Sequence, residues 1–365
     1  MNLQKILGQQ HIKEKMHNSI VKSNFPQSKI LVDKDGYGGL NLAVEIAKDL
    51  LGIGVTFNGD VLDHPDLYFS YPTFVDKQTS QDLVDSWLDL IKKNIFIDFN
   101  DWKNTSTNNQ GKIRKAEIDI IFSKAHLKSF SGGAKVFILW NMQKIDVYGQ
   151  NKLLKLLEEP PENTYFLLIT GSLDHLLPTI ISRCQISNLN PINFEDQKNY
   201  LKNLKEEMDY DLIIKSSMGS ISRSIKYINL DAELISHEKN FVDCLRFAFL
   251  AKKNKKAILD LTKWVEMITS KSNSREFQGE FLSYCSYMIR EAMLISYKSK
   301  NLTSFVSGSN FKIEKLSPFI HSKNLIQIVD LIEDSHYSIA RNVNAKIVFK
   351  NFAIKLTKLI NTAED

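Results

Sequence analysis

A short segment rich in glycine, Asp33 to Leu40, has residue types suited to binding a nucleotide phosphate. A phosphate-binding loop needs glycines that bring backbone N–H groups close, a lysine for the outer phosphates, and a Ser or Thr hydroxyl for magnesium. Gly36, Gly38 and Gly39 supply the glycines, but Gly39 and Leu40 occupy the positions of the lysine and the hydroxyl residue. Asp33 replaces the opening glycine with an anion. The segment therefore predicts weak binding of ATP or none.

A second element is needed, because glycines between a strand and a helix are by themselves more typical of an ordinary turn than of a ligand site. Phosphate hydrolysis also requires acidic residues at the end of a neighbouring apolar strand, one for magnesium and one to activate water. The apolar run Lys135–Leu139 is followed by Trp140 and Asn141, which provide neither. Two degenerate elements in the right order predict a nucleotide-binding scaffold that has lost its chemistry.

The elements that would position these residues alternate between apolar runs and helical patterns in the first half of the chain. Such alternation is typical of an α/β fold with a parallel sheet and crossover helices. Two of the runs are apolar throughout, as expected of strands that are covered on both faces. The predicted strand and helix pairs are Ser28–Val32 with Leu40–Leu51, Lys135–Trp140 with Gln150–Glu159, and Tyr165–Thr170 with Leu176–Arg183.

From about residue 188 the strand signals end and helical spacing predicts two further domains. We expect an α/β domain over residues 1–187, a small helical domain over 188–230 and an all-helical domain over 231–365. The segment 96–114 is rich in Asn, Thr and charge, and it predicts an exposed loop or insertion. The expected helices after residue 188 are Glu195–Lys205, Tyr210–Ser216, Ser220–Ile228, Asn240–Ala251, Lys256–Thr269, Gln278–Tyr297, Lys323–Asn342 and Asn344–Leu359.

Composition excludes several classes of protein. The 365 residues are 43% hydrophobic and 24% charged, with a net charge of +5, so binding to nucleic acid is permitted but not demanded. We expect no membrane contact and a cytoplasmic location, since neither a membrane-spanning run nor a signal peptide is recognisable. Cys184, Cys244 and Cys285 are too few and too far apart for a disulfide framework or a zinc site.

At four places, and more loosely at a fifth, the sequence resembles the AAA+ clamp-loader family, specifically the bacterial DNA polymerase III delta-prime subunits. Order and spacing match over about residues 1–230, and the run Leu-Leu-Lys-Leu-Leu-Glu-Glu-Pro-Pro followed by Ser-Arg-Cys is highly specific. The resemblance implies that the helical domains are a lid and a collar. The matching segments are Ile6–Gln9 with His11, His64–Leu67, Asn151–Pro161, Leu177–Cys184 and, more loosely, Arg341–Lys346.

The resemblance also implies a role for Arg183 in the triplet Ser182, Arg183 and Cys184. In this family the arginine reaches the γ-phosphate bound by the next subunit and stabilises the charge of the transition state. Thr170 matches the first sensor position of active members. The second sensor arginine falls on Ser222, with Arg223 one place late. A surface or helix-capping arginine is the ordinary alternative for Arg183.

Family zinc ligands are missing, because residues 51–72 contain no cysteine, and His64 is interpreted as a local hydrogen-bonding residue. Glu158 and Glu159 precede two prolines, so helix-end and interface roles are favoured over catalysis. We expect no cofactor and no metal.

The function implied is that of a stator without ATPase activity, serving gamma/tau motor subunits, the clamp-binding delta subunit, the sliding clamp and primed DNA. One alternative is a working gamma/tau-like ATPase, but the chain lacks the residues that this activity needs. The other is a free-standing nucleic-acid-binding protein, which should have a denser basic face.

Overall fold

The computed structural model describes most of the chain and divides it into two compact units, residues 1–206 with 217–224, and residues 207–216 with 225–365. The domain boundaries expected at residues 187 and 230 remain predictions. The described residues are 7–34, 36–53, 60–75, 78–106, 111–205, 208–217, 219–229, 232–270, 272–299, 302, 303, 305, 307 and 311–362.

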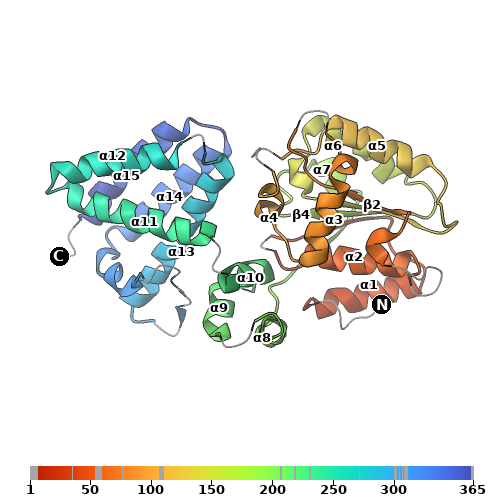
Figure 1. Ribbon diagram of the computed structural model, residues 1–365, viewed down its shortest axis with the longest axis horizontal. Helices are drawn as coiled ribbons and strands as arrows, with labels where there is room; N and C mark the ends of the chain where they lie inside the picture. The colour runs from red at the N-terminus through yellow and green to blue at the C-terminus, as the bar shows by residue number, and fades with distance from the viewer. Residues whose placement is uncertain are drawn as a thin grey trace. The chain divides into compact units, whose positions relative to one another are not determined.

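The first unit is built on a five-stranded sheet in the order β2-β3-β4-β1-β5, in which every neighbouring pair is parallel. Figure 1 shows the sheet between α5 and α6 on one side and α1 and α2 on the other. β1 lies beside β4, so the segments that follow these two strands leave the same edge of the sheet together. The strands are β1 (Ser28–Val32), β2 (Leu67–Ser70), β3 (Lys135–Trp140), β4 (Thr164–Thr170) and β5 (Gln185–Asn188).

Helices cover both faces of this sheet. In β3, Val136 and Ile138 pack into the core formed with α1, α2 and α3, whereas Phe137 and Leu139 pack into the core formed with α5, α6 and α7. Alternate residues of a strand point to opposite faces, which is why a strand buried on both faces is apolar throughout. The helices are α1 (Gln10–Val21), α2 (Gly39–Leu50), α3 (Val84–Lys93), α4 (Phe99–Lys103), α5 (Lys115–His126), α6 (Val147–Glu158), α7 (Pro178–Ile181) and α8 (Phe194–Lys202).

The second unit is helical and has its own core, in which Trp264, Phe281 and Phe349 are buried together. α11 packs against α12 and α15, and α14 packs against α13 and α15. Short 3-10 turns η6 (Ile313–Lys315) and η7 (Ser317–Phe319) pack on α13. The helices from α9 onward are α9 (Tyr210–Ser217), α10 (Ile221–Asn229), α11 (Ala232–Ala251), α12 (Lys255–Ile268), α13 (Arg275–Ser296), α14 (Leu325–Ala340) and α15 (Ala345–Ile360).

The predicted fold class is confirmed, a parallel α/β sheet followed by helices. The three predicted strands form β1, β3 and β4, and the expected helices form with ends shifted by up to a few residues, α11 starting eight residues early. The helix expected over Leu176–Arg183 is only the single turn α7, so Arg183 follows a helix rather than lying in one.

The expectation of an exposed loop is wrong for residues 96–103, whereas the alternative of an insertion over residues 96–114 remains a prediction. This segment contains α4, which begins at a capping box formed by Asp98 and Asp101. Phe96 and Ile97 are buried, and Trp102 is fully buried with its indole N–H donating to the carbonyl of Pro72 at 2.7 Å. The polar residues that suggested a loop satisfy the ends of a short helix whose apolar face enters the core. Residues 107–110 lie outside the described part of the chain.

Candidate functional site

The loop between β1 and α2 is closed by its own carboxylate. Asp33 accepts hydrogen bonds from the backbone N–H groups of Tyr37 at 2.5 Å and Gly39 at 2.7 Å. Backbone N–H groups at the start of a helix are the donors that hold a phosphate in nucleotide-binding loops. Here an aspartate side chain takes these donors, so the loop binds an internal anion.

The same loop is crowded by neighbouring side chains. Gly36 has a φ of 73°, and a Cβ added there would lie 2.8 Å from the hydroxyl oxygen of Ser222. That hydroxyl donates to the carbonyl of Phe96 at 2.9 Å. A Cβ on Gly39 would lie 2.8 Å from Asp33 Oδ2, so a lysine at this position would collide with the carboxylate. Leu40 is buried. Asp35 lies outside the described residues.

The second degenerate element lies beside the loop and forms an uncharged hydrogen-bond network. Thr170 donates to the amide oxygen of Gln143 at 3.0 Å, and the Gln143 amide donates to Asn141 Oδ1 at 2.9 Å. Trp140 is buried and its ring lies 5.1 Å from that of Trp87. None of Asn141, Gln143 and Thr170 ionises at neutral pH, so this network supplies neither a charged magnesium ligand nor a general base.

Arg183 lies on the surface of the same unit, after α7. Its guanidinium donates to the carbonyl of Thr179 at 2.9 Å and forms an ion pair with Glu158 Oε1 at 2.6 Å. About one third of the Arg183 side chain remains exposed, 35%, together with 43% of the Glu158 side chain. Thr179 and Glu158 therefore bind part of the guanidinium, and the rest remains accessible to solvent. A planar donor group that is only partly engaged can bind a further oxygen anion.

The two neighbours of Arg183 have structural roles. Ser182 caps the end of α7 and its hydroxyl donates to the carbonyl of Thr179 at 3.1 Å. Cys184 packs against the core below α6 and α7, and burial raises the pKa of its thiol to about 12. A thiol with this pKa stays protonated at neutral pH and is a poor nucleophile. Of the three side chains, that of Arg183 is the one that carries a charge at neutral pH and can bind an anion.

The His64–Leu67 segment anchors a loop. The His64 ring accepts a hydrogen bond from the N–H of Asp66 at 3.1 Å, as expected of a local hydrogen-bonding residue. The buried Asp66 carboxylate accepts from the N–H groups of Phe130 and Ser131, each at 2.8 Å, and from the hydroxyls of Ser129 and Ser131. Burial alone would raise the pKa of Asp66, but these hydrogen bonds outweigh it and hold the pKa below its usual value.

Within the described ranges, His, Cys, Asp and Glu side chains form no group of three or more that could hold a metal ion. Among the helices whose residues are described, none is both long and apolar enough to cross a bilayer.

Sequence reasoning missed the contacts that three residues of this region make. Gln143 joins Asn141 to Thr170, Glu158 pairs with Arg183, and Ser222 packs on Gly36. The sequence predicted a helix-end or interface role for Glu158, without naming Arg183 as its partner. Its place on the last turn of α6, in the most specific run of the sequence, was the available signal.

Part of the first unit matches a known protein family. Residues 62–193 match the family described as "DNA polymerase III, delta subunit". In this region the chain is similar to DNA polymerase III subunits.

Within that class, the predicted resemblance to delta-prime subunits is confirmed. The chain is 30% identical over 148 residues to "DNA polymerase III subunit delta'" of Buchnera aphidicola subsp. Baizongia pistaciae, which covers 37% of this chain and 43% of the relative. It is 34% identical over 110 residues to that of Haemophilus influenzae, covering 30% and 34%. The matched region is thus less than half the length of these two relatives.

A subunit of another name also matches. The "DNA polymerase III subunit gamma" of Buchnera aphidicola subsp. Schizaphis graminum is 24% identical over 334 residues, 87% of this chain and 84% of that protein. Sequence similarity alone therefore does not distinguish a delta-prime from a gamma type of subunit. The distinction has to come from the residues of the loop between β1 and α2.

Proposed function

We propose that this chain is a clamp-loader subunit of DNA polymerase III that binds no ATP itself and offers Arg183 to the nucleotide site of a neighbouring motor subunit. The observation that carries the proposal is the pair of hydrogen bonds from Tyr37 and Gly39 to the Asp33 carboxylate. An anion fixed at the N-terminus of α2 excludes a phosphate from the same donors by occupancy and by charge repulsion.

The proposed role of Arg183 rests on accessibility and geometry. An arginine finger stabilises the charge that develops on the transferred phosphoryl group, and it must reach across a subunit boundary. Arg183 lies at the surface after a single turn of helix, and Glu158 and Thr179 hold its guanidinium. Such a tether reduces the conformational entropy that the side chain loses when it engages a phosphate.

In the assembly that we propose, gamma/tau subunits supply ATP turnover and a delta subunit binds the sliding clamp. This chain acts as a stator during loading of the clamp onto primed DNA. The first unit contributes the finger, residues 188–230 form a lid and residues 231–365 join a collar. The proposed location is the cytoplasm, where replication proteins of bacteria act.

The long match to a gamma subunit supports one alternative, a working ATPase. That function requires a lysine and a hydroxyl residue at positions 39 and 40, where the chain has Gly39 and the buried Leu40. It also requires acidic residues at positions 140 and 141, where the chain has Trp140 and Asn141. The local chemistry therefore favours the stator.

The test is steady-state ATP turnover by the motor subunit with delta, clamp and primed DNA. The full chain is added as wild type, as Arg183→Ala, or as the control Lys93→Ala, which removes an exposed cation at the end of α3 in the first unit. We expect no turnover by this chain alone, stimulation by wild type and by the control, and loss of stimulation with Arg183→Ala. Magnesium-dependent turnover by this chain alone would overturn the stator proposal. Equal stimulation by all three versions would overturn the finger.

A further inference from the structure

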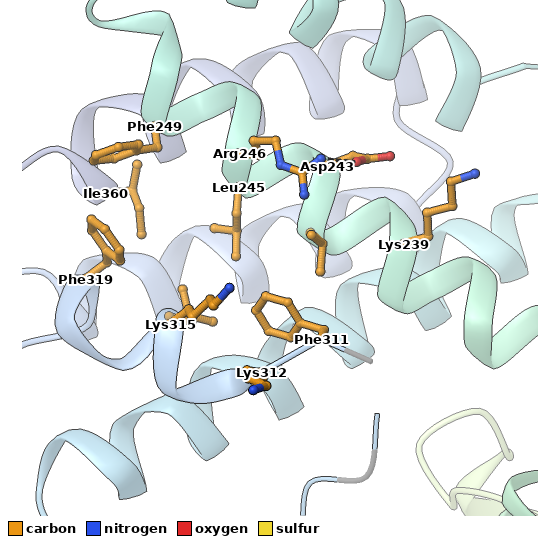
Figure 2. A pocket seen from close by; sticks show the side chains of 12 residues that line it. Lys239, Asp243, Leu245, Arg246, Phe249, Phe311, Lys312, Lys315, Phe319 and Ile360 are labelled. Carbon is orange, nitrogen blue, oxygen red and sulfur yellow. Dashed lines mark ion pairs between the residues drawn. The ribbon is translucent and has the colours of Figure 1, made fainter. Parts of the chain in front are cut away.

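A pocket in the helical unit is independent of the loop and of Arg183. It has a volume of about 500 Å³ and lies between α11, the η6 and η7 turns and the end of α15. Its apolar lining includes Leu245, Phe249, Phe311, Phe319 and Ile360, and Figure 2 shows Phe249, Phe319 and Ile360 gathered at one end. Pockets of this size with apolar walls and a few polar groups are typical of ligand sites.

The rim of the pocket is basic. Lys239, Arg246, Lys312 and Lys315 line it, and Asp243 is the one acidic side chain among its lining residues. Arg246 approaches Asp243 at 3.6 Å and stays 62% exposed (Figure 2). Among the described residues, none forms an ion pair with Lys239, Lys312 or Lys315. The four cations and one carboxylate leave an excess of positive charge around an apolar floor.

We infer that this pocket binds a short acidic peptide segment of a partner protein, with a bulky apolar side chain inserted between Phe311 and Phe319 and carboxylates on the lysine rim. An apolar anchor in a pocket supplies most of the affinity of such contacts, whereas complementary charge gives specificity and speeds association. The floor matches Leu, Ile or an aromatic side chain, and the rim matches Asp or Glu on either side of it.

The aromatic rings favour a peptide over single-stranded nucleic acid. Binding of bases requires open ring faces on which they stack. Phe319 and Phe249 instead pack edge to face with ring centroids 4.9 Å apart, and Phe311 packs in the same manner on Phe305 at 6.3 Å. Rings that are engaged with each other form the walls of a hollow for a side chain, not a stacking platform.

The probe is a library of short random peptides displayed on phage and selected on the immobilised full chain. The test variant is Lys312→Glu/Lys315→Glu, and the matched control is Lys350→Glu/Lys355→Glu, which makes the same change in charge at exposed positions of α15. All four lysines are exposed, so both variants should fold, as circular dichroism can verify. A third variant, Phe249→Ala, removes an apolar wall that is 39% exposed.

We expect enriched sequences that combine Asp or Glu with Phe, Trp, Leu or Ile. A synthetic peptide of the enriched sequence, labelled with fluorescein, should bind wild type and the control equally within about twofold, and the test variant at least about tenfold more weakly. Phe249→Ala should also weaken binding. Failure of wild type to enrich any sequence over the test variant would overturn the inference. So would enrichment of basic peptides, or tighter binding of an oligodeoxythymidylate probe that depends on the same lysines. Because this readout uses no ATP, the inference can fail while the proposed function stands.

Discussion

The start of α2 and the end of α7 each bind a charged side chain, an anion at the first and a cation at the second, but they do so in different ways. At the start of α2, the Asp33 carboxylate is bound by backbone N–H groups that belong to its own loop, at 2.5 and 2.7 Å. At the end of α7, the Arg183 guanidinium is bound by Glu158 and Thr179 but stays 35% exposed. The two donors to the first charge belong to its own loop, whereas the second charge is partly exposed to solvent.

Under the proposed function, this contrast explains how a nucleotide-binding scaffold loses one role and keeps another. A phosphate site is lost when the protein itself satisfies the donors, because a ligand must then displace a bound group. An arginine finger remains functional only if some of its guanidinium N–H donors are not hydrogen-bonded within the protein, because these donors must still bind a phosphate. Substitutions at each end should therefore produce effects of different kinds, on catalysis at one end and on stability at the other.

The largest expected effect is at Arg183. Loss of an arginine finger lowers the rate of phosphoryl transfer by at least about 10³-fold, so Arg183→Ala should nearly silence the neighbouring site in single-turnover ATP hydrolysis by the complex. Arg183→Lys should recover only part of the rate, because an ammonium keeps the charge but not the planar fork. Full activity of the lysine variant would show that charge alone is sufficient, and would weaken the comparison.

The next effect is on stability at Asp33. Removing the carboxylate in Asp33→Ala leaves two backbone donors without their acceptor and should lower the free energy of unfolding by about 2 kcal/mol. Asp33→Asn keeps an amide oxygen that can accept one of these bonds and should lose about half as much. Urea denaturation of the full chain measures both. An alanine variant as stable as wild type would show that the carboxylate does not hold the loop.

A third prediction concerns the anion site that Asp33 occupies. In Asp33→Gly the N–H groups of Tyr37 and Gly39 become available, so added sulfate should stabilise this variant by about 1 kcal/mol more than wild type at concentrations well above its dissociation constant. Thermal unfolding with and without sulfate, at matched ionic strength in sodium chloride, provides the comparison. Identical sulfate responses in both proteins would argue that other features, such as Ser222 against Gly36, close the loop.

The smallest effect on stability is expected at Glu158. Its ion pair with Arg183 is solvent-exposed, so Glu158→Ala should change the free energy of unfolding by less than about 1 kcal/mol. It should nevertheless lower stimulation of the motor subunit several-fold, about threefold to tenfold, because a free arginine must be ordered when it binds. Glu159→Ala is the matched control, an exposed carboxylate one residue away. If both variants stimulate like wild type, Glu158 does not position the finger.

The central strands could be predicted from the sequence because burial on both faces leaves a continuous apolar run. β3 and β4 contain such runs, and β1 contains a shorter one after Ser28 and Lys29. The outer strands β2 and β5 were not predicted, since both are only four residues long and β5 is mostly exposed. An edge strand with polar residues is recognised by its pairing partner, which lies far away in the sequence.

For the candidate site, too, some features could be predicted from the sequence and others could not. The absence of a lysine at position 39 and of acids at positions 140 and 141 can be read directly from the sequence, and it predicts the loss of nucleotide chemistry. The partners of the remaining groups were not. Glu158 and Arg183 are 25 positions apart, and only the packing of α6 on α7 brings them together. The error over residues 96–114 came from composition, although the capping box at Asp98 and Asp101 was a readable signal of a helix.

The Asp33 carboxylate has a further consequence as a covalently attached competitor. A group tethered by a few residues acts at an effective concentration in the millimolar range or above, and this value does not change with the state of the cell. Any free nucleotide would have to compete with the Asp33 carboxylate, which is always present and is also negatively charged. Rises and falls of the nucleotide pool would therefore leave this loop unchanged, and the unit would be a fixed reference against which nucleotide-dependent movement elsewhere can be exerted.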